Sequence, residues 1–108
     1  MSILSESNKA INALNELIPL LKSGAQRDKY LSERKKLNDQ ASELAHKSLI
    51  NYGPELNNAI DALTKVTESA NKAKKSIEET GENINKVADT IDKIAAAVAA
   101  LASFIAIL

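Results

Sequence analysis

The chain has 108 residues, of which 44% are hydrophobic but only 3% aromatic, with 3 Gly and 2 Pro. This length accommodates one domain, and the scarcity of aromatic and turn-forming residues excludes a β-sandwich or a β-barrel. Because 14 Lys and Arg balance 14 Asp and Glu, no net positive field recruits nucleic acid. The absence of Cys excludes disulfides and zinc-thiolate sites. We therefore expect a single all-α domain over residues 1–108 that does not bind nucleic acid.

Residues 1–22 are expected to form an N-terminal amphipathic helix, because their apolar side chains recur at helical spacing. This stripe consists of Ile11, Leu14, Ile18 and Leu21. Pro19 lies inside the stripe and lacks the N–H that a helix interior uses, so it predicts a kink. Residues 24–52 carry a weaker apolar stripe and are expected to form a second helical segment.

Residues 54–108 show the most regular pattern, with apolar side chains at alternating spacings of three and four residues. This heptad pattern predicts one helix of about 80 Å, at roughly 1.5 Å per residue, starting at Pro54. Gly81 is its weakest point, because glycine costs about 1 kcal/mol relative to alanine in a helix interior. The expected seam for helix packing or oligomer formation comprises Leu56, Leu63, Val66, Ile77, Ile84, Val87 and Ile91. The expected turns and hinges are Pro19, Gly53, Pro54 and Gly81.

The strongest turn signal, Gly53-Pro54, separates two halves of similar length. The sequence therefore predicts a long antiparallel helical hairpin, or coiled-coil rod. One hairpin buries only one seam and leaves other apolar positions uncovered. We therefore expect further helices from identical chains, and hence a homo-oligomeric bundle.

Residues 94–108 read IAAAVAALASFIAIL, in which Ser103 is the only polar side chain. A helix that is apolar on all sides has to be buried in protein or in lipid. At about 22 Å this segment is shorter than the roughly 30 Å hydrocarbon core of a bilayer. Small residues allow several copies to insert together, but they fit the dry interior of a soluble bundle equally well. The residues expected to contact lipid are Ile94, Val98, Leu101, Phe104, Ile105, Ile107 and Leu108. Lys86 and Lys93 are placed to meet the headgroups.

The sequence offers little chemistry for catalysis. Glu43 and His46 form one Glu-x-x-His pair, but a carboxylate-bridged metal site needs a second copy of that pair. His46 is the only histidine and has no recognisable Ser or Cys partner for nucleophilic catalysis. We therefore expect no enzyme activity, no cofactor, no metal site and no small-molecule substrate. The start of the chain lacks the pattern of a signal peptide, so the expected state is a soluble protein, cytoplasmic or released, that associates with membranes.

A long helical rod with an apolar end resembles the helical arms of α-helical pore-forming toxins of the cytolysin A type. The resemblance covers residues 56–108 and the segment LNELIPLL at 14–21, without a diagnostic motif. It implies an apolar end that is covered in a soluble state and exposed on assembly. The expected function is a membrane-active, self-assembling helical protein, either a small pore-forming toxin or a toxin component. The alternative is a soluble coiled-coil protein that forms a homo-oligomer or filament, or docks the helices of a partner protein.

Overall fold

The structure, a computed structural model, describes residues 2–46, 53–81 and 84–108, except for the side chain of Ile84. Within these ranges the chain is almost entirely helical and has no strand, which confirms the all-α prediction. The elements are α1 (Ile3–Leu17), the short 3-10 helix η1 (Ile18–Leu20), α2 (Ala25–Ala45), α3 (Pro54–Thr80) and α4 (Ile84–Ala106). The last part of the expected segment 24–52, residues 47–52, lies outside the described residues.

Local sequence signals coincide with the ends of α1 and α3. The Ser2 hydroxyl accepts a hydrogen bond from the Ser5 N–H at 3.4 Å and caps the start of α1. At its other end α1 changes into η1 beside Pro19, whose nitrogen has no hydrogen to donate. α3 begins at Pro54, a position whose N–H has no partner within a helix in any case.

Gly81 separates α3 from α4. Its φ of 89° lies in the left-handed region that favours glycine, and its N–H donates to the Ile77 carbonyl at 2.7 Å. The single helix expected over residues 54–108 is therefore replaced by two helices. The physical reason is burial, because folding α4 back onto α3 covers the apolar sides of both helices within one chain.

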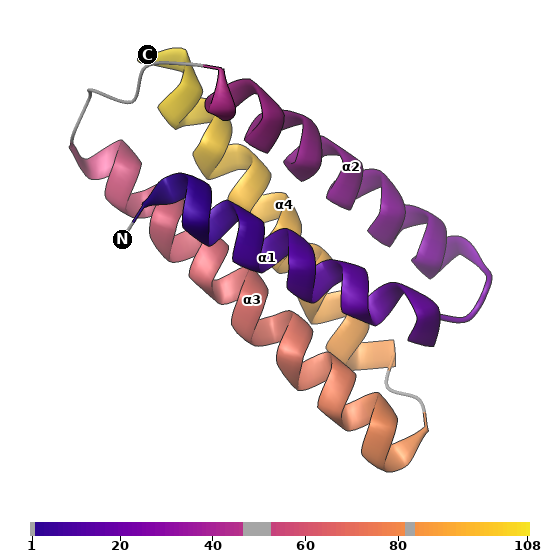
Figure 1. The fold of residues 1–108 in the computed structure, drawn as a ribbon. Helices are drawn as coiled ribbons and strands as arrows, with labels where there is room; N and C mark the ends of the chain where they lie inside the picture. The colour runs from indigo at the N-terminus through magenta and orange to yellow at the C-terminus, as the bar shows by residue number, and fades with distance from the viewer. Residues whose placement is uncertain (1, 47–52, 82–83) are drawn as a thin grey trace.

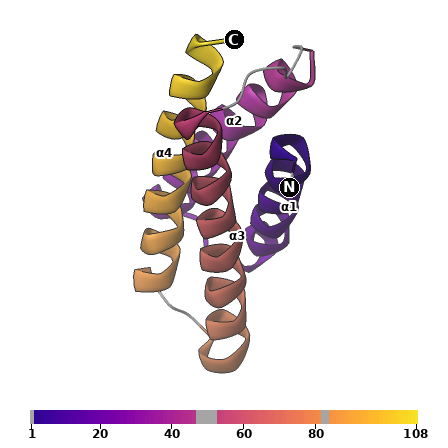
Figure 2. The same ribbon diagram turned by 90° about the vertical axis from the view of Figure 1, so that its left-hand side faces the viewer.

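The four helices form a bundle with extents of 44 × 22 × 17 Å. Figure 1 shows α1 and α3 running alongside one another in the same direction, as do α2 and α4. Within each of the pairs α1/α2 and α3/α4 the helices are antiparallel (Figure 1). Figure 2 places α3 between α1 and α4. This bundle differs from the expected rod of about 80 Å, whose length assumed roughly 1.5 Å per residue over an unbroken helix. Assembly with further copies stays a prediction.

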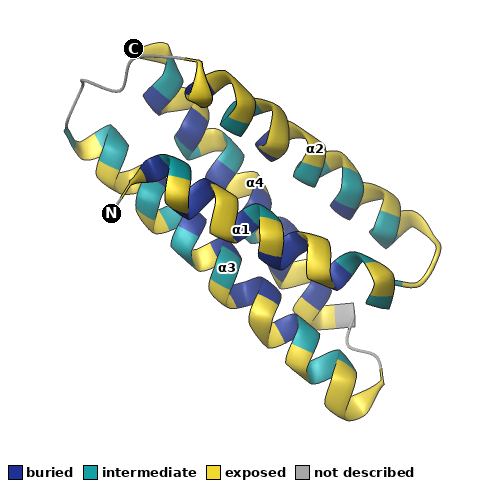
Figure 3. Cartoon of the chain, in the orientation of Figure 1, coloured by how far each residue is buried: buried dark blue, intermediate teal, exposed yellow. Residues whose placement is uncertain are grey.

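The core follows the heptad spacing of each helix, and α2 contributes least to it (Figure 3). Its buried side chains are Tyr30, Leu37 and Leu44, one per heptad. The Tyr30 hydroxyl donates to the Leu14 carbonyl at 2.8 Å and joins α2 to α1. Burial raises the pKa of Tyr30 and outweighs the opposing effect of the Arg34 guanidinium, so the phenol stays a neutral donor at ordinary pH. Among the described residues, α2 thus has the fewest buried apolar side chains of the four α-helices.

Candidate functional site

The inner side of the apolar segment 94–108 is packed into the core of its own chain. Ile94, Leu101 and Phe104 are buried there, although the sequence analysis assigned them to lipid contact. Of the other residues in that set, Val98, Ile105 and Leu108 are half-buried, and Ile107 is 43% exposed. In this conformation α2 and α3 cover most of the predicted lipid-contact residues. The sequence left open whether lipid or the interior of a helical bundle would cover them.

The outer side of the same segment is exposed and has no charge. We call this surface the outer alanine face; it consists of Ala95, Ala96, Ala99, Ala102, Ser103, Ala106 and Ile107. By contrast, α2 presents exposed charged side chains along its length: Asp28, Lys29, Lys35, Lys36, Asp39 and Glu43. A surface helix normally turns a charged or polar side to water. The end of α4 therefore departs from that pattern on the side that no described residue covers.

One polar contact holds α2 against the apolar segment. The Gln40 side-chain N–H donates to the Val98 carbonyl at 2.9 Å. The oxygen of the same amide is buried and, among the described residues, has no hydrogen-bond partner. A buried acceptor without a partner costs free energy, about 1–3 kcal/mol. The contact between α2 and α4 thus combines one hydrogen bond with one unsatisfied polar atom.

A buried polar cluster fixes α4 against α3. The Ser69 hydroxyl donates to the Asp89 carboxylate at 2.7 Å and lies 2.9 Å from the Thr90 hydroxyl oxygen. Since Ser69 gives its only proton to Asp89, the Thr90 hydroxyl donates either to Ser69 or to the Lys86 carbonyl, 3.0 Å away. This cluster sets the register of the two helices. Sequence analysis missed it because Ser and Thr are ordinary residues of exposed helix surfaces.

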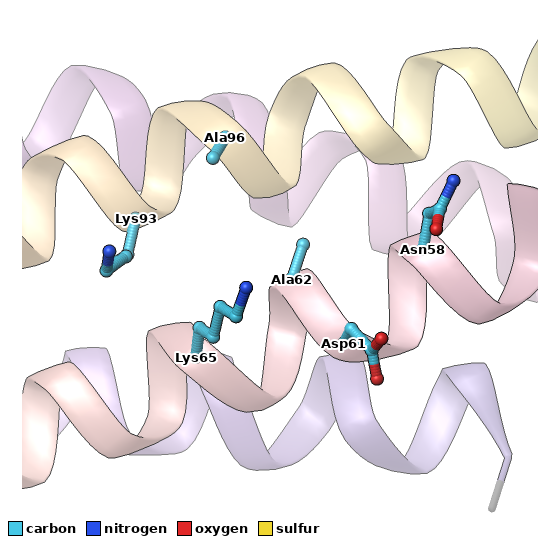
Figure 4. Close-up of a pocket in the computed structure, with 6 residues that line it drawn as sticks. All are labelled: Asn58, Asp61, Ala62, Lys65, Lys93 and Ala96. Atoms are coloured by element: carbon cyan, nitrogen blue, oxygen red, sulfur yellow. The ribbon is translucent and has the colours of Figure 1, made fainter.

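A groove of about 260 Å³ opens on the outside of the bundle between α3 and α4. It is lined by Asn58, Asp61, Ala62, Lys65, Lys93 and Ala96. Figure 4 shows Lys65 from α3 and Lys93 from α4 extending into the same opening, while Ala62 and Ala96 form its walls. The Asp61 carboxylate points away from both lysine nitrogens (Figure 4). The groove therefore presents two ammonium groups beside small apolar side chains.

The expected seam lies mainly inside this one chain. Leu63, Val66, Val87 and Ile91 are buried, and Leu56 and Ile77 are half-buried. The side chain of Ile84 lies outside the described residues. A heptad stripe has the same form whether its partner is another helix of the chain or another copy. These residues pack within the fold of one chain, and their role between copies stays a prediction.

The remaining candidates lie apart from the apolar segment. The expected hinges coincide with element boundaries: Pro19 in η1, Gly53 and Pro54 at the start of α3, and Gly81 at its end. Glu43 and His46 are exposed near the end of α2, and His46 Nδ1 lies 2.8 Å from the Ser42 carbonyl. Across the described ranges, no three His, Asp or Glu side chains gather in a way that could hold a metal ion.

In the part of the chain that the structure describes, no helix combines the length and apolar character needed to cross a bilayer. Comparisons with protein-family models, curated proteins and solved structures gave no match.

Proposed function

We propose that the protein is a membrane-active helical bundle whose helix α4 contacts lipid. The observation that carries this proposal is the lack of charge on both sides of α4 from Ile94 to Leu108. Packing in the core accounts for the inner side, but the outer alanine face is exposed in the closed bundle. An uncharged helix surface of this length is suited to an apolar environment outside the chain.

Exposure of the inner side to lipid requires α2 to leave α4. Burying Tyr30, Leu37 and Leu44 stabilises the cover by about 1.5–3 kcal/mol for each side chain, or about 5–9 kcal/mol in all. Transfer of the predicted lipid-contact residues into a bilayer returns about 0.3–0.6 kcal/mol each, or about 3 kcal/mol. One chain therefore does not recover the cost of opening from insertion alone. Insertion by a single copy is unfavourable, and contacts between copies have to supply the difference.

The outer alanine face offers such contacts. Ala95, Ala99, Ala102 and Ala106 recur on one side of α4, and small side chains at this spacing let helices approach closely in a bilayer. Self-assembly in the membrane is thus part of the proposal. A small pore-forming toxin, or a component of one, is its most specific form, because several inserted copies of α4 could surround an opening.

Flotation with liposomes and release of an entrapped dye test the proposal. We expect the full chain to float with vesicles and to release dye, and Ala99→Asp with Ala102→Asp to abolish both effects, because both charges lie on the outer alanine face. The matched control, Ser32→Asp with Ser42→Asp, adds the same charge at exposed positions of α2 and should retain both. A folded full chain that neither floats nor releases dye would overturn the proposal.

The second candidate is a soluble coiled-coil protein, favoured by the same recurrence of exposed alanines. A stripe of small residues also allows close packing against a helix of another copy or of a partner protein in water. The second candidate assembles in water, whereas the first requires lipid. Sedimentation in buffer without lipid should show a stable oligomer or filament for the second candidate, and dissociation of that assembly by Ala99→Asp would support it.

A further inference from the structure

The groove between α3 and α4 brings together two cationic side chains, of which Lys93 is paired with a described carboxylate and Lys65 is not. Among the described residues, Lys65 has no carboxylate within 4.0 Å. Lys93 has one ionic contact, to Asp89 at 4.0 Å. The other Asp89 oxygen accepts a hydrogen bond from the Ser69 hydroxyl at 2.7 Å, so this carboxylate is shared between Ser69 and Lys93. Both ammonium groups lie beside the same opening (Figure 4), so an anion bound there would be attracted to both.

The lining of the groove fits a ligand with a compact anionic group. Ala62 and Ala96 leave space between the helices, and the Asn58 amide stands further along the groove as a hydrogen-bond donor (Figure 4). Lysine is a common ligand for phosphate, which it binds as a point charge. Asp61 opposes binding of an anion, but its carboxylate points away from the two lysine nitrogens. The opening therefore favours a phosphate over a cation.

The side of α4 that faces the groove continues without charge beyond Lys93. Its members follow at helical spacing: Ala96, Ala100, Ser103 and Ile107, all exposed or half-buried. From Lys93 to Ile107 this path is about 21 Å long at roughly 1.5 Å per residue. One leaflet of a bilayer, with its headgroups, measures about 20–22 Å. A phosphate held by the lysines would thus place acyl chains along an uncharged path of matching length.

We propose that this groove binds the phosphate group of an anionic phospholipid, with Lys65 and Lys93 as its two cationic contacts. The inference rests on the proposed lipid contact of α4 and adds the chemistry of the lipid that is recognised. Binding requires α3 and α4 to stay together, because Lys65 and Lys93 come from these two helices, which the Ser69–Asp89 hydrogen bond joins. The groove is therefore formed whether or not α2 has left α4.

Binding to two kinds of vesicle tests the inference, one of phosphatidylcholine and one that also contains phosphatidylglycerol. We expect the chain to prefer the anionic vesicles. Lys65→Gln with Lys93→Gln should weaken that binding by about 30-fold. The control, Lys29→Gln with Lys75→Gln, removes the same charge from exposed positions outside the groove and should lower binding by about 3-fold or less. Circular dichroism verifies that each variant is folded.

The outcomes separate this inference from the proposed function. Equal binding to both vesicles, or equal losses for the two pairs of variants, overturns the groove as a phosphate site while the lipid contact of α4 stands. If the chain binds neither vesicle, NMR titration with inorganic phosphate decides. Shifts at the groove residues Ala62 and Ala96 that the double variant lacks would support phosphate recognition from a soluble source and refute the lipid as its ligand. The absence of such shifts would overturn the inference altogether.

Discussion

Replacement of Gly81 by alanine tests whether the turn between α3 and α4 determines the shape of the protein. An added Cβ at Gly81 would meet no atom within 4 Å, so its cost is conformational and not a clash. The φ of 89° is the source of that cost, because an alanine side chain disfavours the left-handed region by about 1–2 kcal/mol. The same substitution favours a continuous helix by about 1 kcal/mol.

The two effects act in the same direction. Together they shift the balance between the closed bundle and a form with α3 and α4 in line by about 2–3 kcal/mol, or roughly 30- to 150-fold. In the extended form the apolar sides of α3 and α4 no longer pack against each other. A second copy can cover them, so we expect an exchanged dimer to become measurable at high protein concentration.

Light scattering coupled to size exclusion measures the dimer, and thermal unfolding measures the destabilised monomer. The melting temperature of Gly81→Ala should fall by about 5–10 °C. Thr80→Ala is the control, because it changes an exposed side chain in the same turn of α3 and leaves glycine at the position with positive φ. A Gly81→Ala protein that melts with the parent and stays monomeric would refute the role assigned to this turn.

Three further substitutions probe the packing of the bundle. Gln40→Leu removes the buried unsatisfied oxygen together with the hydrogen bond to the Val98 carbonyl. Because the unsatisfied acceptor costs about 1–3 kcal/mol and the hydrogen bond contributes about 0.5–1.5 kcal/mol, the free energy of unfolding should rise by about 1 kcal/mol in urea titrations, and the release of dye from vesicles should slow. Ile91→Asp places a carboxylate at a position that is 4% exposed in the core; circular dichroism should show an unfolded chain, whereas a folded, dissociated monomer would place Ile91 between copies. Burial raises the pKa of Tyr30 above its ordinary 10.0, so the folded state retains the proton that the unfolded state loses, and stability should decline as pH rises beyond about 10. Tyr30→Phe should flatten that decline in urea titrations at a series of pH values.

The heptad pattern predicted which side chains face a helix, because period alone determines the side of a helix on which they lie. It could not predict whose helix they face. Leu63 and Val66 meet α4 and α1 of their own chain because Gly81 allows the chain to reverse. The sequence marked Gly81 as a weak point of one long helix. Whether such a glycine bends a helix or ends it depends on the area that the reversed helix can bury, which no local pattern contains.

Polar contacts between helices were the features that were hardest to predict from the sequence. Ser69 and Thr90 are buried, yet each precedes an apolar residue of the heptad pattern by one position and resembles a surface residue. Their hydrogen bond depends on the register of α3 against α4, which in turn depends on where the turn at Gly81 ends. Gln40 presents the same difficulty, because its partner is a backbone carbonyl with no sequence signature.

The apolar segment 94–108 gave a single sequence signal that the structure divides into two parts. Ile94, Leu101 and Phe104 are accounted for by the stability of the bundle, since they are among its most buried residues. The stability of the bundle does not explain the lack of charge at Ala99 and Ala102. Both residues are exposed, so a charged side chain there would destabilise the bundle little. The proposed contact with lipid would explain the lack of charge on this outer side, because one leaflet has a length similar to that of the uncharged path that begins at Lys93.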